Sequence, residues 1–124
     1  MYKEIKVGEN LVPMLANAAT PIRFRQVFGK NLLRYFLGEE SQDEVAAMTG
    51  ELAYIMAKAG EGADMNRLNL DDYTTWLEGF DAMAFVDPET VAQIIKLYQG
   101  NMETGSTAKK NKADRARKDR KSVV

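Results

Sequence analysis

A sharp change of composition near residue 100 divides this 124-residue chain into two unequal parts. Residues 1–100 carry 15 acidic and 9 basic side chains, a net charge of −6, and hold most of the large apolar residues. Residues 101–124 carry 3 acidic and 8 basic side chains, a net charge of +5. They hold too little apolar surface to offset the entropy of ordering them. We therefore predict a folded domain over residues 1–100 and a disordered, basic tail over residues 101–124.

The segment just before this boundary has clear start and stop signals of a helix. Asp87 can cap the first turn, and Pro88 suits the first helical position because its missing N–H has no partner there anyway. Gly100 can adopt the left-handed conformation that closes a helix. Apolar residues recur between them at the spacing of one helical face, namely Val91, Ile94, Ile95 and Tyr98.

Two more helical stretches are predicted nearer the N-terminus. Thr20-Pro21 opens an apolar stretch to residue 37, which forms either one helix kinked near Gly29 or two short helices. Ser41 with Glu44 three residues later is a capping box. It precedes the most regular helical period in the chain, which ends at Gly60 and Gly62 and is formed by Val45, Met48, Leu52, Ile55, Met56 and Ala59.

A further helix is predicted after a loop at residues 61–69. Asn69 or Asp71 can cap it. Gly79 is unfavourable inside a helix by about 1 kcal/mol relative to alanine, so we expect it to mark a close contact with another helix. One aromatic-rich side of this helix is formed by Leu70, Tyr73, Trp76, Leu77, Phe80 and Met83.

The first sixteen residues predict a β-hairpin. Two short segments of strand character, Tyr2–Val7 and Leu11–Ala16, flank a three-residue loop that contains Gly8. Pro13 cannot donate to a strand ladder, which places its strand at an edge. Because two strands alone are only marginally stable in water, the hairpin must pack on helices or pair with another copy. The predicted fold class is α+β, an N-terminal hairpin packed on four to five helices.

The chain contains no cysteine and no histidine, which removes thiolate nucleophiles, disulfides and the most common neutral-pH base. Neighbouring carboxylates such as Asp71-Asp72 point to different faces of a helix, and no calcium-loop or phosphate-loop motif is present. We therefore predict no enzymatic activity, no cofactor and no metal. No apolar run reaches the roughly 20 residues that cross a membrane, so the cytoplasm is the expected location.

Three segments resemble the tail assembly chaperones of long-tailed phages and prophages of Gram-positive bacteria. They are YKEIKVGENLVPMLANAATPIRFRQVFGKNLL at residues 2–33, LNLDDYTTWLEGFD at residues 68–81 and ETVAQIIKLYQGNMETGSTAKKNK at residues 89–112. The resemblance spans most of residues 1–112 and rests on pattern and order, since none of these segments is a catalytic signature.

The resemblance implies a small non-virion protein in the cytoplasm of the bacterial host. In this family the chaperone coats the long, helical, apolar tape measure protein and keeps it soluble until tail tube subunits polymerise around it. A longer form commonly arises by programmed ribosomal frameshifting near the end of the short form, and its added part recruits the tail tube protein. Lys109-Lys110-Asn111 is compatible with the slippery codons of such a frameshift. Covering a long partner also implies a homo-oligomer.

Two sets of residues are candidates for partner contacts. The first set lines either the core or a partner groove, and consists of Trp76, Phe80, Ile94 and Tyr98. The second set lies on the basic tail, and consists of Lys109, Lys110, Lys112, Arg115 and Arg117. An alternative function is a small nucleic-acid-binding protein that uses this tail electrostatically. No aromatic residue lies between the basic ones, so bases would have no stacking platform, which argues against nucleic acid.

Overall fold

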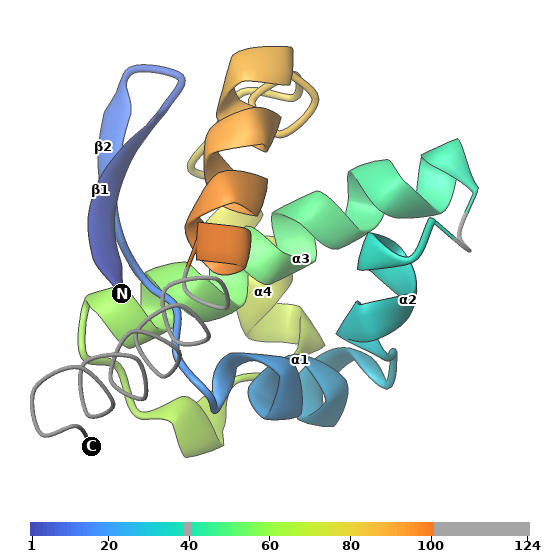
Figure 1. Cartoon of the computed structure of the whole chain (residues 1–124). Coiled ribbons are helices and arrows are strands. Elements are labelled where there is room, and N and C mark those ends of the chain that lie inside the picture. The colour runs from blue at the N-terminus through green and yellow to red at the C-terminus, as the bar shows by residue number, and fades with distance from the viewer. Residues whose placement is uncertain (39–40, 101–124) are drawn as a thin grey trace, which may run out of the picture.

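The computed structural model describes residues 1–38 and 41–100, and its architecture is α+β, as predicted (Figure 1). The predicted tail at residues 101–124 lies outside the described residues. Two strands are followed by five α-helices and one short 3₁₀ turn. Their bounds are β1 Tyr2–Val7, β2 Asn10–Leu15, α1 Thr20–Phe28, α2 Leu32–Phe36, α3 Gln42–Gly60, the 3₁₀ turn Met65–Arg67, α4 Leu70–Leu77 and a last helix over residues 88–100.

Helix α3 is the central element of the fold. It runs across the middle of the molecule in Figure 1, with the hairpin and the 88–100 helix on one side and α1 on the other. Residues 48–57 are all buried, so this stretch is covered all round rather than along one stripe. A helix that is apolar all round belongs in the centre of a domain. The largest fully buried side chains include Tyr54, Phe24, Ile5, Met14 and Leu32.

The hairpin is antiparallel, with Val7 paired to Asn10 across a two-residue turn that begins at Gly8. The predicted three-residue loop is therefore wrong by one residue, because Asn10 already belongs to β2. Gly8 has a left-handed φ of 64°, which glycine adopts without a steric penalty. Ile5 and Val12 pair on the inner face and are buried, so this face of the hairpin joins the core.

Strand β2 approaches α3 at Gly60 so closely that no side chain would fit there. A Cβ atom built on Gly60 would lie 2.5 Å from the carbonyl oxygen of Pro13 and 2.9 Å from the backbone nitrogen of Met14. In the sequence this glycine served only to end a helix. In the structure it is the last residue of α3, and it allows the hairpin to dock.

Residues 21–37 form the two short helices of the prediction, separated by Gly29, whose φ is 68°. The expected cap at Thr20 is wrong. The N-cap position is Ala19, which makes no side-chain cap. The Thr20 hydroxyl instead accepts a hydrogen bond from the Asn17 backbone N–H at 2.9 Å, and thereby fixes the turn that leaves the hairpin.

Three other predicted caps are confirmed. Ser41 Oγ accepts from the Glu44 N–H at 3.3 Å, and Asn69 Oδ1 accepts from the Asp72 N–H at 2.8 Å. Asp87 Oδ2 accepts from the Thr90 N–H at 3.0 Å. Gly100 differs from expectation, because it is still helical instead of closing the helix in a left-handed conformation.

Helix α4 is shorter than the pattern predicts. It ends at Leu77, and a turn then folds Phe80 back onto Trp76, with ring centroids 4.8 Å apart. Gly79 therefore lies outside the helix, and a Cβ atom there would meet only an ordinary contact at 3.5 Å. The expected close helix contact at Gly79 is wrong. Met83 is also 70% exposed and does not share the buried aromatic side.

Candidate functional site

The four predicted partner residues do not line one groove. Ile94 and Tyr98 are buried in the core, whereas Trp76 and Phe80 are half-buried. Tyr98 stacks on Phe36 of α2, with ring centroids 5.1 Å apart and an angle of 17° between the rings. These placements favour the core alternative for Ile94 and Tyr98.

Trp76 and Phe80 belong to a separate aromatic cluster. Trp76 contacts Tyr54 at 5.6 Å and Phe85 at 5.5 Å between ring centroids, and Phe80 contacts Phe85 at 5.3 Å. The tilted and edge-to-face angles of these pairs are those that aromatic rings prefer. The cluster covers α3 and comprises Phe24, Phe28, Tyr54, Tyr73, Trp76, Phe80 and Phe85.

This cluster makes stability sensitive to alkaline pH. Burial raises the pKa of the Tyr54 hydroxyl, and the hydrogen bond to Asp72 raises it further. Burial likewise raises the pKa of Tyr73 from 10.0 to about 12. The unfolded chain therefore ionises at a lower pH than the folded one, and ionisation favours unfolding.

We expect the free energy of unfolding to fall as pH rises from about 10 to 12, with no such loss below the unfolded tyrosine pKa. Lys30 acts in the same direction. Although burial lowers the pKa of Lys30, the hydrogen bonds to Glu44 and Glu51 raise it overall. The stability that Lys30 contributes is therefore also lost as pH rises above the pKa that Lys30 has in the unfolded chain. Urea titrations at several pH values test this. Tyr73→Phe should flatten the alkaline fall, and an equally steep fall in that variant would contradict the assignment.

A more open surface lies where α1 meets α2. Three large apolar side chains there are mostly exposed, with Ile22 at 60%, Leu33 at 56% and Leu37 at 59%. Leu33 and Leu37 are one helical turn apart, so they extend on the same side of α2. We call the set Ile22, Arg25, Leu33, Arg34 and Leu37 the α1–α2 surface. It offers apolar contact area that nothing in the described chain covers.

Two adjoining hollows run across this surface. One has a volume of about 500 Å³ and is lined by Pro21, Ile22 and Gln26 together with Arg25 and Asn31. The other has a volume of about 380 Å³ and shares Arg25 and Asn31, with Arg34 also in its lining. The two hollows adjoin at these shared residues, and Leu33 and Leu37 line neither of them.

The α1–α2 region is basic within an otherwise acidic domain. Residues 20–38 contain four basic side chains and no acidic one. Arg23 is engaged with the Asn66 side chain at 3.0 Å. Arg25 lines both hollows, and the second is lined also by Arg34, Lys30 and the acidic Glu44.

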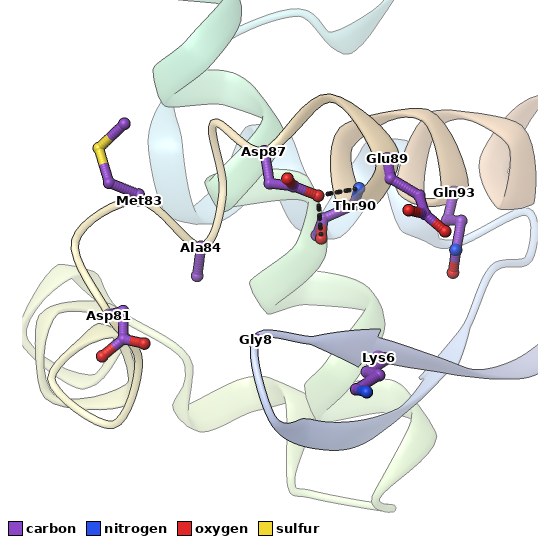
Figure 2. A pocket seen from close by; sticks show the side chains of 9 residues that line it. All are labelled: Lys6, Gly8, Asp81, Met83, Ala84, Asp87, Glu89, Thr90 and Gln93. Carbon is purple, nitrogen blue, oxygen red and sulfur yellow. Dashed lines mark hydrogen bonds between the residues drawn. The ribbon is translucent and has the colours of Figure 1, made fainter.

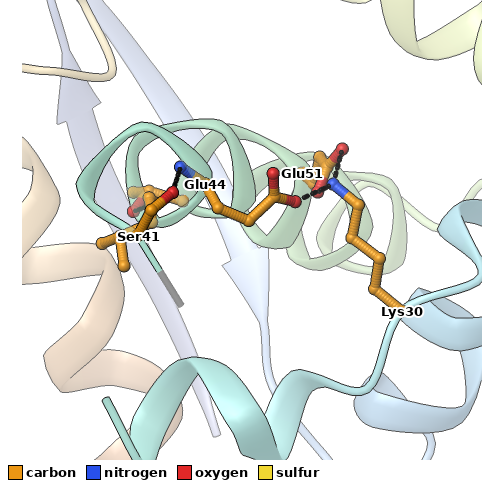
Figure 3. A network of polar contacts seen from close by, with 6 residues as sticks. Lys30, Ser41, Glu44 and Glu51 are labelled. Atoms are coloured by element: carbon orange, nitrogen blue, oxygen red, sulfur yellow. Dashed lines mark hydrogen bonds and ion pairs between the residues drawn. The ribbon is translucent and has the colours of Figure 1, made fainter. Parts of the chain in front are cut away.

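The fourth basic residue of this region, Lys30, anchors α1 and α2 to α3 (Figure 3). Its Nζ lies 2.6 Å from Glu44 Oε1 and 3.1 Å from both carboxylate oxygens of Glu51. Burial raises the pKa of Glu51, and the contact with Lys30 partly opposes this. Figure 3 also shows Ser41 at the start of the same helix, capping the Glu44 N–H. This network fixes the position of the α1–α2 surface on the core.

A second cleft lies between the tip of the hairpin and the start of the 88–100 helix (Figure 2). It has a volume of about 460 Å³, and its walls include Lys6, Asp81, Asp87 and Glu89. One of these carboxylates is already engaged, because Asp87 Oδ2 also accepts from the Thr90 hydroxyl at 3.2 Å. Within the described residues, no group of three acidic side chains could hold a metal ion. The contact between Thr90 and Asp87 is explained by the cap at the start of the 88–100 helix, where Asp87 also accepts from the Thr90 N–H.

The apolar pattern of residues 21–37 predicts helices but does not indicate which of their apolar side chains stay exposed on the α1–α2 surface. One signal was available. Leu33 and Leu37 fall on the opposite side of α2 from Leu32 and Tyr35, which are buried. A five-residue helix that is apolar on both sides can bury only one of them.

No protein-family model, no curated protein and no solved structure matches this chain. Among the helices that the structure describes, none is both long and apolar enough to cross a membrane. The five predicted contact residues of the basic tail, from Lys109 to Arg117, lie outside the described residues.

Proposed function

We propose that the chain is a tail assembly chaperone of a long-tailed phage or prophage, acting in the cytoplasm of the bacterial host. It binds the tape measure protein, keeps it soluble and helps to recruit tail tube subunits, in part through a longer frameshifted form. The resemblance over residues 2–33, 68–81 and 89–112 supports this function. The observation that carries it is the uncovered α1–α2 surface on a small domain with no catalytic constellation in its described part.

The chemistry of the surface suits a long helical partner. An amphipathic helix docks through apolar residues at spacings of three and four, and it needs a shallow channel of apolar contacts to receive them. Leu33 and Leu37 supply exposed apolar contacts on one side of α2, Ile22 supplies another on α1, and exposed apolar surface on soluble proteins commonly marks interaction sites. Arg25 can pair with an acidic side chain beside the partner's apolar stripe, which fixes the partner's orientation.

Replacing Leu33 and Leu37 together by glutamate should abolish partner binding and leave the domain folded. Each buried leucine contributes about 1.5–3 kcal/mol, so the double change should weaken binding by at least about a hundredfold. The measurement is co-expression with the tape measure protein of the same phage, followed by assay of its soluble fraction. Leu70→Glu is the matched control, because Leu70 is 58% exposed on a different helix. Equal loss in both variants would refute this surface as the binding site.

Nucleic-acid binding is the second candidate, and the basic α1–α2 region favours it together with the tail. Its signature is binding to arbitrary DNA that weakens steeply with salt. Deleting residues 109–121 should abolish such binding if the tail carries it, while tape measure solubility is unaffected. Absence of salt-dependent DNA binding by the full chain would exclude this alternative.

A further inference from the structure

The two edges of the hairpin differ in how they are closed. Ala16 and Met1 exchange both backbone hydrogen bonds, at 2.8 and 2.6 Å. Bonded pairs alternate along an antiparallel ladder, so the next ones are Lys3 with Met14, Ile5 with Val12, and Val7 with Asn10. The even-numbered residues of β1 and the odd-numbered residues of β2 therefore point their N–H and C=O groups away from the ladder.

The outer edge of β2 is blocked at its middle. Pro13 has no N–H to offer another strand. Its carbonyl lies against Gly60 of α3, at the close contact already described. An added strand could not hydrogen bond to β2 at this position.

The outer edge of β1 is open. Its outward-pointing backbone groups belong to Tyr2, Glu4 and Lys6, whose side chains are all exposed. Within the described chain, none of these backbone groups makes a hydrogen bond. At its Lys6 end the strand borders the cleft of Figure 2, whose opposite wall is the start of the 88–100 helix. Open strand edges of this kind are templates for pairing with another strand.

The charges along this edge identify the partner strand. Glu4 and Lys6 lie on one face of β1, and their neighbours across the hairpin are the uncharged Pro13 and Leu11. Neither residue takes part in an ion pair within the described chain. Lys3 lies on the opposite face of β1 from Glu4 and Lys6. The face of Glu4 and Lys6 thus carries one charge of each sign, which complements the same face of an antiparallel copy.

We propose that two copies of this chain pair edge to edge through β1, forming a four-stranded antiparallel sheet across a two-fold axis at Ile5. In this register Glu4 of each copy lies opposite Lys6 of the other, so that two ion pairs form. A register shifted by two residues would place Glu4 opposite Glu4, which is unfavourable, so the charges select a single register.

The test uses charge reversal in the full chain, measured by sedimentation equilibrium over a range of concentrations. The wild type should form a dimer of twice the 13.9 kDa chain mass. Glu4→Lys and Lys6→Glu alone each turn two attractive contacts into two repulsive ones and should weaken dimerisation by about tenfold or more. The double variant should restore it, because the opposite charges then face each other again in exchanged positions.

Glu78→Lys is the matched control, because it makes the same charge change at an exposed position away from β1. It should leave the dimer unchanged. A wild type that stays monomeric, single variants that still dimerise fully, or a double variant that fails to recover would each overturn the proposal.

Amide hydrogen exchange gives a second measurement that needs no variant. In the monomer, the ladder protects the N–H groups of Lys3, Ile5 and Val7. In the dimer, those of Glu4 and Lys6 become protected as well, because they bond to the partner strand. Protection of these two amides should therefore rise with protein concentration. Fast exchange of both at concentrations where the dimer predominates would overturn the edge-to-edge arrangement.

Discussion

Replacing Gly60 by alanine is expected to destabilise the fold by about 1–3 kcal/mol, the usual cost of inserting a methyl group where there is no room. The new Cβ would lie 2.5 Å from the Pro13 carbonyl oxygen and 2.7 Å from its carbonyl carbon. Both atoms belong to the backbone of β2, so no side-chain rotation relieves the clash. The hairpin must shift away from α3, which opens the contact between Met14 and the core. This cost exceeds the roughly 1 kcal/mol that alanine gains in a helix.

Urea denaturation of Gly60→Ala measures the loss, and two other glycines provide controls. At Gly50 a Cβ would meet the Tyr73 hydroxyl at 2.9 Å. That atom is the end of a side chain that can move, so the expected loss is smaller. At Gly79 the nearest atom is 3.5 Å away, so alanine should be close to neutral. A Gly60→Ala variant as stable as the wild type would contradict the tight docking of the hairpin.

The parts of the fold that depend on local chemistry are predictable from the sequence. Ser41, Asn69 and Asp87 each place a side-chain oxygen within reach of a backbone N–H three residues later, and each accepts that hydrogen bond in the structure. Gly29 ends α1 in the left-handed conformation that few other residues adopt. These features involve residues at most four apart, so spacing alone predicts them.

Contacts between distant segments are not predictable in this way. The sequence pattern singled out Gly79 for a close helix contact, whereas the close contact lies between Gly60 and Pro13, which are far apart in the chain. Nothing local to Gly60 indicates that a strand will cross it. The same limit applies to α4, which ends at Leu77 because the following turn lets Phe80 pack on Trp76. The spacing of the apolar residues alone predicts that α4 continues beyond Leu77.

For the candidate partner-binding residues too, the sequence predicts the local helices but not which of their faces distant segments bury. Trp76 and Tyr98 were identified as large residues on helical faces, but spacing does not reveal which faces other elements cover. The structure places Tyr98 in the core and leaves Leu33 and Leu37 mostly exposed, because the side of α2 that carries Tyr35 contacts Thr49 of α3 and the opposite side lies in solvent. Partner contacts are therefore easier to assign after burial is known than from apolar periodicity.

Tyr54 shows how the core and the surface polar contacts are joined in this domain. Its side chain is fully buried in α3, and its ring contacts those of Phe28, Tyr73 and Trp76. Its hydroxyl donates to Asp72 Oδ2 at 2.6 Å, at the start of α4. One residue of the central helix thus holds α1 and α4 through its ring and the first turn of α4 through its oxygen.

Tyr54→Ala should have the largest effect on stability of any single change considered for this chain, a loss of about 3–5 kcal/mol. It empties the space between three rings, and the surrounding helices cannot all collapse into it. For a small domain with roughly 5–15 kcal/mol of stability, this is a large share of the total. Tyr54→Phe keeps every ring contact and removes only the hydrogen bond, so it should cost about 1 kcal/mol. Asp72 is left partly exposed with Lys58 Nζ at 3.8 Å, which limits that cost.

Urea denaturation of both variants at neutral pH separates the two contributions of Tyr54. The difference between Tyr54→Ala and Tyr54→Phe measures the packing of the ring, and the difference between Tyr54→Phe and the wild type measures the hydroxyl. Equal losses in the two variants would mean that the hydrogen bond to Asp72, and not the aromatic cluster, holds α4 on α3. A greater loss in Tyr54→Ala places most of that stabilisation in the ring contacts, because the phenylalanine variant lacks only the oxygen.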